Sequence, residues 1–137
     1  MSEANKRLVL RWFEEVWNNG RAEAIEELFA ENGIAHGLSE DPDNPVRGPK
    51  DYRPFHSMLR GAFPNIKVVV EDMIAEGDKV TARCLVQGKH EGDHLGIEAT
   101  NQEVDFTGIT IVRIADGQIV EAWNNFDFSK MNKQIGL

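Results

Sequence analysis

The chain changes its hydrophobic period once, at Pro64. Before Pro64, apolar side chains recur every three or four positions, which is typical of helices with one buried face. This spacing predicts a helix over residues 3–18, and a second helix that carries the stripe from Ala24 to Phe29 and ends at Asn32-Gly33. A third helix is predicted between Pro49 and Pro64. Proline is favourable in the first turn of a helix, and a proline further along the chain ends the helix that precedes it.

After Pro64, apolar and polar residues alternate with a period of two, which indicates strands. Residues 66–90 form one predicted hairpin around Gly77-Asp78, and residues 103–128 form a second one around Asp116-Gly117. Both dipeptides are typical of tight turns. Residues 91–101, which contain several polar turn residues, are interpreted as the connection between the hairpins.

The register of the second hairpin decides which side chains face the core. A two-residue turn predicts three cross-strand pairs: Ile114 with Ile119, Thr110 with Trp123, and Phe106 with Asp127. In this register Asp127 shares one face with Trp123. A single bulge would move Asp127 to the other face of the sheet.

Helices followed by an antiparallel meander indicate an α+β protein. We find no internal repeat and no linker, so we predict a single domain over residues 1–137. Three N-terminal helices laid across one face of a strongly curved, mostly antiparallel sheet would form a cone. Such a cone keeps a pocket between helices and sheet, where a small ligand could bind.

Composition narrows the possible partners. The formal net charge is −8, and lysine and arginine are scattered, which argues against nucleic acid and against anionic membrane surfaces as partners. The single cysteine, Cys84, rules out an intrachain disulfide and suits a reducing compartment. No signal peptide or membrane-spanning run is evident, so we expect a cytoplasmic protein.

Residues 90–94, His-Glu-Gly-Asp-His, match the H-E-x-x-H pattern of zinc proteases. That motif works on a helix, which brings both histidines to one face. Here a strand pattern leads into the motif and a glycine interrupts it, and on a strand the histidines would lie about 13 Å apart. We interpret the segment as a turn and predict no metal, with a looser site of His90, Asp93 and His94 as the weaker alternative.

Three segments together resemble the SnoaL-like polyketide cyclase family of the NTF2-like superfamily. They are RWFEEVWNNGRAEAIEELFAE near the start, GKHEG after the first hairpin, and IVRIADGQIVEAWNNFDFSKMNKQIG at the end. The resemblance extends over essentially the whole chain. It implies a cone-shaped α+β fold, a homodimer formed through sheets, a small-molecule substrate and no cofactor. The exposed sheet face that carries Thr81, Arg83, Gln87 and Ile109 is the candidate dimer contact.

The activity implied by this resemblance is ring closure of a polyketide by an intramolecular aldol reaction. By position, Asp127 would be the acid/base residue, since burial in an apolar pocket raises the pKa of a carboxylate into the useful range. Active cyclases of the family also use Gln and His side chains from the sheet, and residues 104–114 contain neither. His36 and His90 are the candidates to supply that donor.

Five further side chains are expected to contact the substrate: Trp12, Trp123, Phe55, Phe106 and His56. Glu121 is expected to form a structural ion pair with Arg113 or Arg83, and Cys84 is expected in the core. Two alternatives remain open. One is a different reaction in the same fold, such as isomerisation, dehydration or epoxide hydrolysis. The other is a non-catalytic ligand-binding or dimerisation module, for which Asp127 would be dispensable. For Asp127 itself, the alternative to an acid/base role is that it faces solvent or caps the C-terminal segment.

Overall fold

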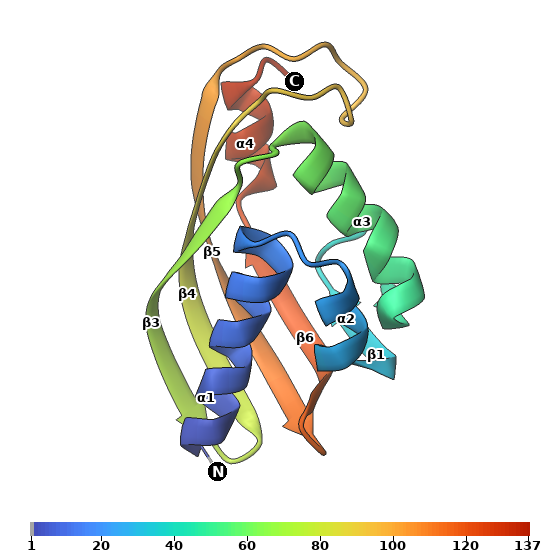
Figure 1. The fold of residues 1–137 in the computed structure, drawn as a ribbon, viewed down its shortest axis with the longest axis vertical. Helices are drawn as coiled ribbons and strands as arrows, with labels where there is room; N and C mark the ends of the chain where they lie inside the picture. Colours follow the sequence, from blue (N-terminus) through green and yellow to red (C-terminus); the bar gives the residue numbers. More distant parts are fainter. Residues whose placement is uncertain (1) are drawn as a thin grey trace.

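A six-stranded sheet carries the helices α1, α2 and α3 on one of its faces in the computed structural model, which describes residues 2–137 (Figure 1). The predicted α+β class is confirmed, although β1 and β2 come before α3 in the chain and not after it. The elements in chain order are α1 (Ser2–Arg11), η1 (Trp12–Asn18), α2 (Glu23–Leu28), β1 (Phe29–His36), β2 (Val46–Arg47), α3 (Gly48–Ala62), β3 (Lys67–Glu76), β4 (Lys79–Lys89), β5 (Glu103–Ala115), β6 (Gln118–Phe126) and α4 (Phe128–Gln134).

The strand order is β2-β1-β6-β5-β4-β3, and the sheet is mixed because β1 runs parallel to β6. Both predicted hairpins, β3–β4 and β5–β6, are confirmed. The prediction that the second helix continues to Asn32-Gly33 is wrong. The backbone becomes extended at Phe29, where β1 begins, and Phe29 pairs with Ile119 of β6. Phe29 can be buried in either conformation, so helical spacing alone did not reveal the strand.

The N-terminal helix changes its geometry halfway along. The predicted helix over residues 3–18 is an α-helix to Arg11 and a π-helix from Trp12 to Asn18. In an α-helix Trp12 and Trp17 would point about 140° apart. In a π-helix, with hydrogen bonds from residue i to i+5, residues five apart lie one above the other. The change therefore turns both indoles to the same side of the helix, where both contact Tyr52 of α3.

A bulge in the second hairpin sets the register of β6. Ile114 pairs with Ile119 as predicted, but Arg113 pairs with Glu121, so Val120 is the extra residue. The predicted pairs of Thr110 with Trp123 and Phe106 with Asp127 are wrong. Thr110 instead pairs with Asn124, and Trp123 pairs with Ile111 on the opposite face of the sheet.

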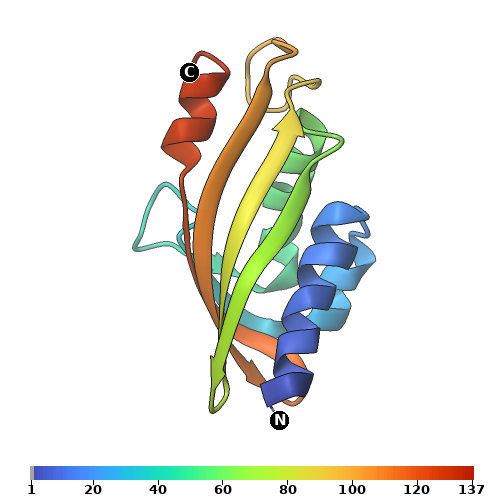
Figure 2. The same cartoon turned by 90° about the vertical axis from the view of Figure 1, so that its left-hand side faces the viewer.

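The core lies between the helices and one face of the sheet, which we call the inner face. Figure 2 shows α1 and α3 on this side of the sheet. Alternate residues of β4 point into it and are buried: Val80, Ala82, Cys84 and Val86. The opposite, outer face is partly exposed. The predicted cone shape and single-domain organisation stay predictions.

A short helix that the sequence did not predict closes the chain. In α4, Met131 is buried, and Ile135 just after the helix is buried too. Gln134 of α4 bonds the backbone N–H and the carboxylate of Asp105 on β5, which fixes α4 beside that strand. No helix within residues 2–137 is long and apolar enough to cross a membrane.

A candidate small-molecule cavity

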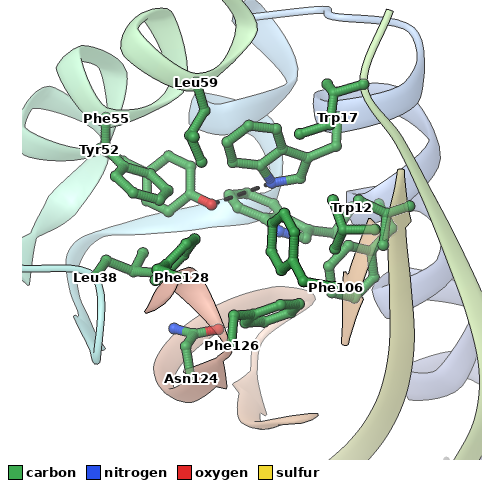
Figure 3. Close-up of a pocket in the computed structure, with 14 residues that line it drawn as sticks. Trp12, Trp17, Leu38, Tyr52, Phe55, Leu59, Phe106, Asn124, Phe126 and Phe128 are labelled. Atoms are coloured by element: carbon green, nitrogen blue, oxygen red, sulfur yellow. Dashed lines mark hydrogen bonds between the residues drawn. The ribbon is translucent and has the colours of Figure 1, made fainter. Parts of the chain in front are cut away.

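An apolar cavity lies between the helices and the inner face of the sheet (Figure 3). It contains about 450 Å³ of space between atoms, including the solvent at its mouth. Among the described residues its fourteen lining side chains carry no charge, and most are aromatic or aliphatic. They are Trp12, Phe13, Trp17, Leu38, Tyr52, Phe55, Leu59, Ile66, Val68, Val86, Phe106, Asn124, Phe126 and Phe128.

The helical wall of the cavity is built from aromatic rings packed edge to face. Trp12 meets Tyr52 with ring centroids 5.1 Å apart, and Trp17 meets Phe55 at 5.9 Å. The indole N–H of Trp17 donates a hydrogen bond of 3.2 Å to the phenol oxygen of Tyr52. Burial raises the pKa of the Tyr52 phenol, so it stays protonated and its O–H remains a donor. The wall is thus rigid and neutral.

The sheet wall depends on a glycine. Gly108 of β5 is paired with Phe126 of β6, and a Cβ atom at Gly108 would lie 2.2 Å from the Phe126 ring. The missing side chain lets the Phe126 ring lie over β5 on the inner face and line the cavity. Any larger residue at position 108 would force this ring to move.

A second, inner lobe adjoins the first and contains about 380 Å³ of space between atoms, a volume that includes adjoining solvent. The two lobes share four lining residues: Trp12, Phe13, Tyr52 and Asn124. Thr110 also lines the inner lobe, opposite Asn124 on the neighbouring strand. The Asn124 amide nitrogen donates to the backbone carbonyl of His36 at 2.9 Å, which fixes the side chain in place.

Three of the five predicted substrate contacts line the cavity: Trp12, Phe55 and Phe106. Trp123 does not line it, because the bulge turns its side chain to the outer face, where it is 37% exposed. His56 lies buried behind the cavity wall, and its Nε2–H donates to the carbonyl of Val16 at 2.7 Å. Burial lowers the pKa of His56.

Asp127 lies outside the cavity, although its neighbours Phe126 and Phe128 both line it. It is exposed and forms the N-cap of α4, where its carboxylate accepts the backbone N–H of Lys130 at 3.0 Å. Its own N–H donates to the carbonyl of Thr107. These contacts match the capping alternative that the sequence left open, and the acid/base role of Asp127 stays a prediction.

His36 lies on the outer face rather than at the cavity. Its Nε2 is 2.7 Å from a carboxylate oxygen of Glu121, and its ring stacks on Trp123 at 5.8 Å. Arg113 approaches the other Glu121 oxygen at 3.4 Å, which confirms the predicted ion pair. The hydrogen bond from His36, together with Arg113, lowers the pKa of Glu121.

His90 is fully buried at the start of the 90–102 connection and does not line either lobe. Its Nδ1 accepts the backbone N–H of Thr100 at 3.1 Å, so the neutral ring carries its proton on Nε2. Nε2 has no hydrogen-bond partner among the described residues. Asp127, His36 and His90 therefore have separate surroundings, and the fold does not gather them around one ligand.

No metal site emerges from the described part of the chain, residues 2–137, where no three His, Cys, Asp or Glu side chains are grouped to hold an ion. The His-Glu-Gly-Asp-His segment is irregular, as predicted, and not helical. Cys84 is buried in the core, and burial raises its pKa to about 11. A thiol of that kind is a poor nucleophile near neutral pH.

The sequence did not single out Asn124 or Thr110 as site residues, and it placed Tyr52 only in a helical stripe. Thr110 already shared the inward face with Trp123 in the predicted register, but the bulge at Val120 hid Asn124. Beyond a bulge the alternation of a strand continues with the opposite sense, so the inward set changes from Trp123 to Asn124.

Fold and site together define the class, an α+β protein whose helices close an apolar small-molecule cavity over one face of a sheet. Residues 7–135 match the sequence profile of the SnoaL-like polyketide cyclases, and the chain belongs to that family. Aklanonic acid methyl ester cyclase DauD of Streptomyces sp. (strain C5) is 26% identical over 130 residues, which cover 93% of this chain and 80% of DauD.

Solved structures agree with this assignment. A protein from Jannaschia sp. CCS1, described as a SnoaL-like polyketide cyclase, matches with a TM-score of 0.85 and 28% identity over 99% of this chain and 94% of its own. AclR of Streptomyces galilaeus, described as a hydroxylase, matches with a TM-score of 0.86 and 26% identity over 99% of this chain and 83% of its own. The same fold thus occurs in proteins named for different reactions.

Proposed function

We propose that this chain binds an apolar, uncharged, polyketide-like molecule in the cavity and promotes its ring closure. The carrying observation is the aromatic cavity, lined by Trp12, Phe55 and Phe106, in a member of the SnoaL-like family. Flat rings offer such a ligand a large apolar contact area. DauD, to which the chain is similar, is named as a cyclase of aklanonic acid methyl ester.

The proposed reaction is an intramolecular aldol closure. A proton leaves the carbon next to one carbonyl, the resulting enolate carbon forms a bond to a second carbonyl carbon, and that oxygen takes up a proton. The product is an isomer of the substrate, so no cofactor is required. The cavity would contribute by holding the chain folded with its reacting carbons close together. The Tyr52 O–H could stabilise the enolate oxygen.

The proposed reaction needs a base, and the lining of the cavity is neutral. No carboxylate or histidine lines either lobe within residues 2–137. For Asp127 to act on a ligand, its carboxylate would have to leave the N-cap of α4 and turn inward between Phe126 and Phe128. The alternative is a ligand-binding protein without catalysis, and the neutral lining of the cavity favours it.

A matched pair of substitutions tests the cavity. Trp12→Phe changes a cavity wall, whereas Trp123→Phe makes the same change on the outer face. Binding of a hydroxylated naphthoquinone is measured by titration calorimetry. We expect clearly weaker binding for Trp12→Phe and unchanged binding for Trp123→Phe. Equal affinity of both variants and the wild type would refute the cavity as the ligand site.

Turnover separates the two candidate functions. Wild-type protein is incubated with a panel of methyl esters that carry several carbonyl groups in one chain. Ring closure leaves the molecular mass unchanged, so it is detected as a change in chromatographic retention time and in absorbance. Closure that requires the cavity side chain Trp12 supports the cyclase. Tight binding of the same compounds without any closure supports the binding protein.

The homodimer also stays a proposal, and the outer face supports it. Cross-strand pairing places Ile74, Thr81, Ile111 and Trp123 in one row, in which the two isoleucines and the tryptophan are more than one-third exposed. Ile109 of the predicted contact face is exposed next to this row. Apolar side chains gathered on a sheet face are typical of a surface that a second copy covers.

A further inference from the structure

One buried hydroxyl of the inner lobe lacks a hydrogen-bond partner. Thr110 is 2% exposed, and its Oγ1 bonds to no other described atom. Buried polar groups are nearly always hydrogen-bonded, because a donor or acceptor removed from water without a partner destabilises the fold. Thr110 lines a lobe that has space for a ligand atom. This hydroxyl can therefore form a hydrogen bond with a polar atom of a ligand that enters the lobe.

Asn124 supplies the matching group on the facing strand. Its amide nitrogen donates to the carbonyl of His36, and its Oδ1 accepts no hydrogen bond from the residues that the structure describes. Thr110 and Asn124 are directly paired across β5 and β6, and such partners have Cβ atoms about 5 Å apart. One oxygen atom between the two side chains can contact both.

The charge of the lobe limits what can enter. The residues that line it are apolar except for Thr110, Asn124, the Tyr52 phenol and the Trp12 indole, and among the described residues none is a lysine, arginine or histidine. A carboxylate placed there would lose its hydration without gaining a cation. A neutral hydroxyl loses little and can both donate and accept.

We propose that the inner lobe is a subsite for one hydroxyl group of the ligand. The hydroxyl oxygen accepts the O–H of Thr110, and the hydroxyl proton is donated to Oδ1 of Asn124. The rest of the ligand lies against the aromatic rings of the first lobe, which include those of Trp17, Phe55 and Phe106. This inference rests on the proposed function, because it requires that the cavity binds a small molecule, and it adds which neutral group orients that molecule.

The test uses three probes of one shape: naphthalene, 2-naphthol and 2-naphthoate. Their affinities are measured by calorimetry for the wild type, for Thr110→Val and for Thr107→Val. Thr107 is the control, since it lies on the same strand but is exposed on the outer face. Wild type is expected to bind 2-naphthol about tenfold more tightly than naphthalene, and naphthoate more weakly than either.

Thr110→Val is expected to remove the preference for 2-naphthol and leave naphthalene binding unchanged, and Thr107→Val is expected to keep the preference. Thr110→Ser retains the hydroxyl and is expected to keep it too, which separates the hydrogen bond from a packing defect. If Thr110→Val still prefers 2-naphthol, or if wild type never does, water alone satisfies the hydroxyl and the subsite is refuted. Those outcomes leave cavity binding intact. If wild type binds neither naphthalene nor 2-naphthol, the proposed function fails as well.

Discussion

Asp127 can be tested so that its structural role and its predicted chemical role give different results. The structure gives it one clear task, since its carboxylate accepts the Lys130 N–H in the first turn of α4. Asp127→Ala removes this acceptor. Loss of an N-cap side chain costs about 1 kcal/mol of stability. Asp127→Asn keeps an acceptor of the same shape and removes only the charge, which near an exposed helix N-terminus is worth about 0.5 kcal/mol.

These free energies convert into measurable melting temperatures. At about 2.1 cal/mol/K of unfolding entropy per residue, 1 kcal/mol shifts the Tm of a chain of this length by about 3–4 °C. We therefore expect Asp127→Ala to melt about 3–4 °C below wild type and Asp127→Asn to melt within about 2 °C of it. Differential scanning calorimetry at pH 7 resolves this difference. An Asn variant that melts as low as the Ala variant would refute the capping argument.

The same two variants examine the chemistry. If Asp127 only caps α4, Asp127→Asn should close rings or bind ligand as the wild type does. Removal of a general base lowers turnover by roughly 10²- to 10⁴-fold. A loss of that size in a normally folded Asp127→Asn protein would show that the carboxylate reaches the ligand. It would also assign to Asp127 the base that the neutral lining of the cavity does not provide.

Four further outcomes follow from single side chains. Thr110→Val should raise the free energy of unfolding by about 1–3 kcal/mol in chemical denaturation, because it removes a buried hydroxyl without a partner. Gly108→Ala should lower it by about 1–3 kcal/mol and weaken ligand binding, because the new methyl group displaces the Phe126 ring. The pKa of His56 is depressed in the fold, so the unfolded chain takes up a proton first as the pH falls below about 6.5. Wild type should therefore lose stability from pH 7 to pH 5 relative to His56→Gln, in melting curves recorded across that range. Ile111→Lys should shift the mass in light scattering from dimer to monomer if the outer face is the contact.

Local patterns in the sequence were enough to predict most of the elements. Period-two alternation with Gly77-Asp78 and Asp116-Gly117 predicted both hairpins, and the stripe after Pro49 predicted α3. The parallel strand β1 was missed because its partner, β6, lies far away in the sequence. The π-helical turn was missed because Trp12 and Trp17 also suit an α-helical stripe that is buried on a broad face.

The candidate site was harder to predict than the fold, and the reason is specific. Aromatic residues near the helices, such as Trp12 and Phe55, keep the same face whatever the strand register, so they were placed correctly. Side chains on β6 depend on the register, which a hairpin turn predicts only when no bulge intervenes. No residue near Val120 signals the bulge, so the sequence turned Trp123 inward in place of Asn124.

That bulge has a chemical consequence that extends beyond the register. Because of the bulge, the amide of Asn124 lines the cavity. The carboxylate of Asp127 does not, since Asp127 follows the strand and forms the N-cap of α4. Membership in the family therefore indicates the fold and the kind of ligand more firmly than the catalytic groups. In a cavity without a charged lining group, selectivity must come from shape and from neutral hydrogen bonds. This is why the unpartnered hydroxyl of Thr110 is more informative about the ligand than the carboxylates elsewhere in the chain.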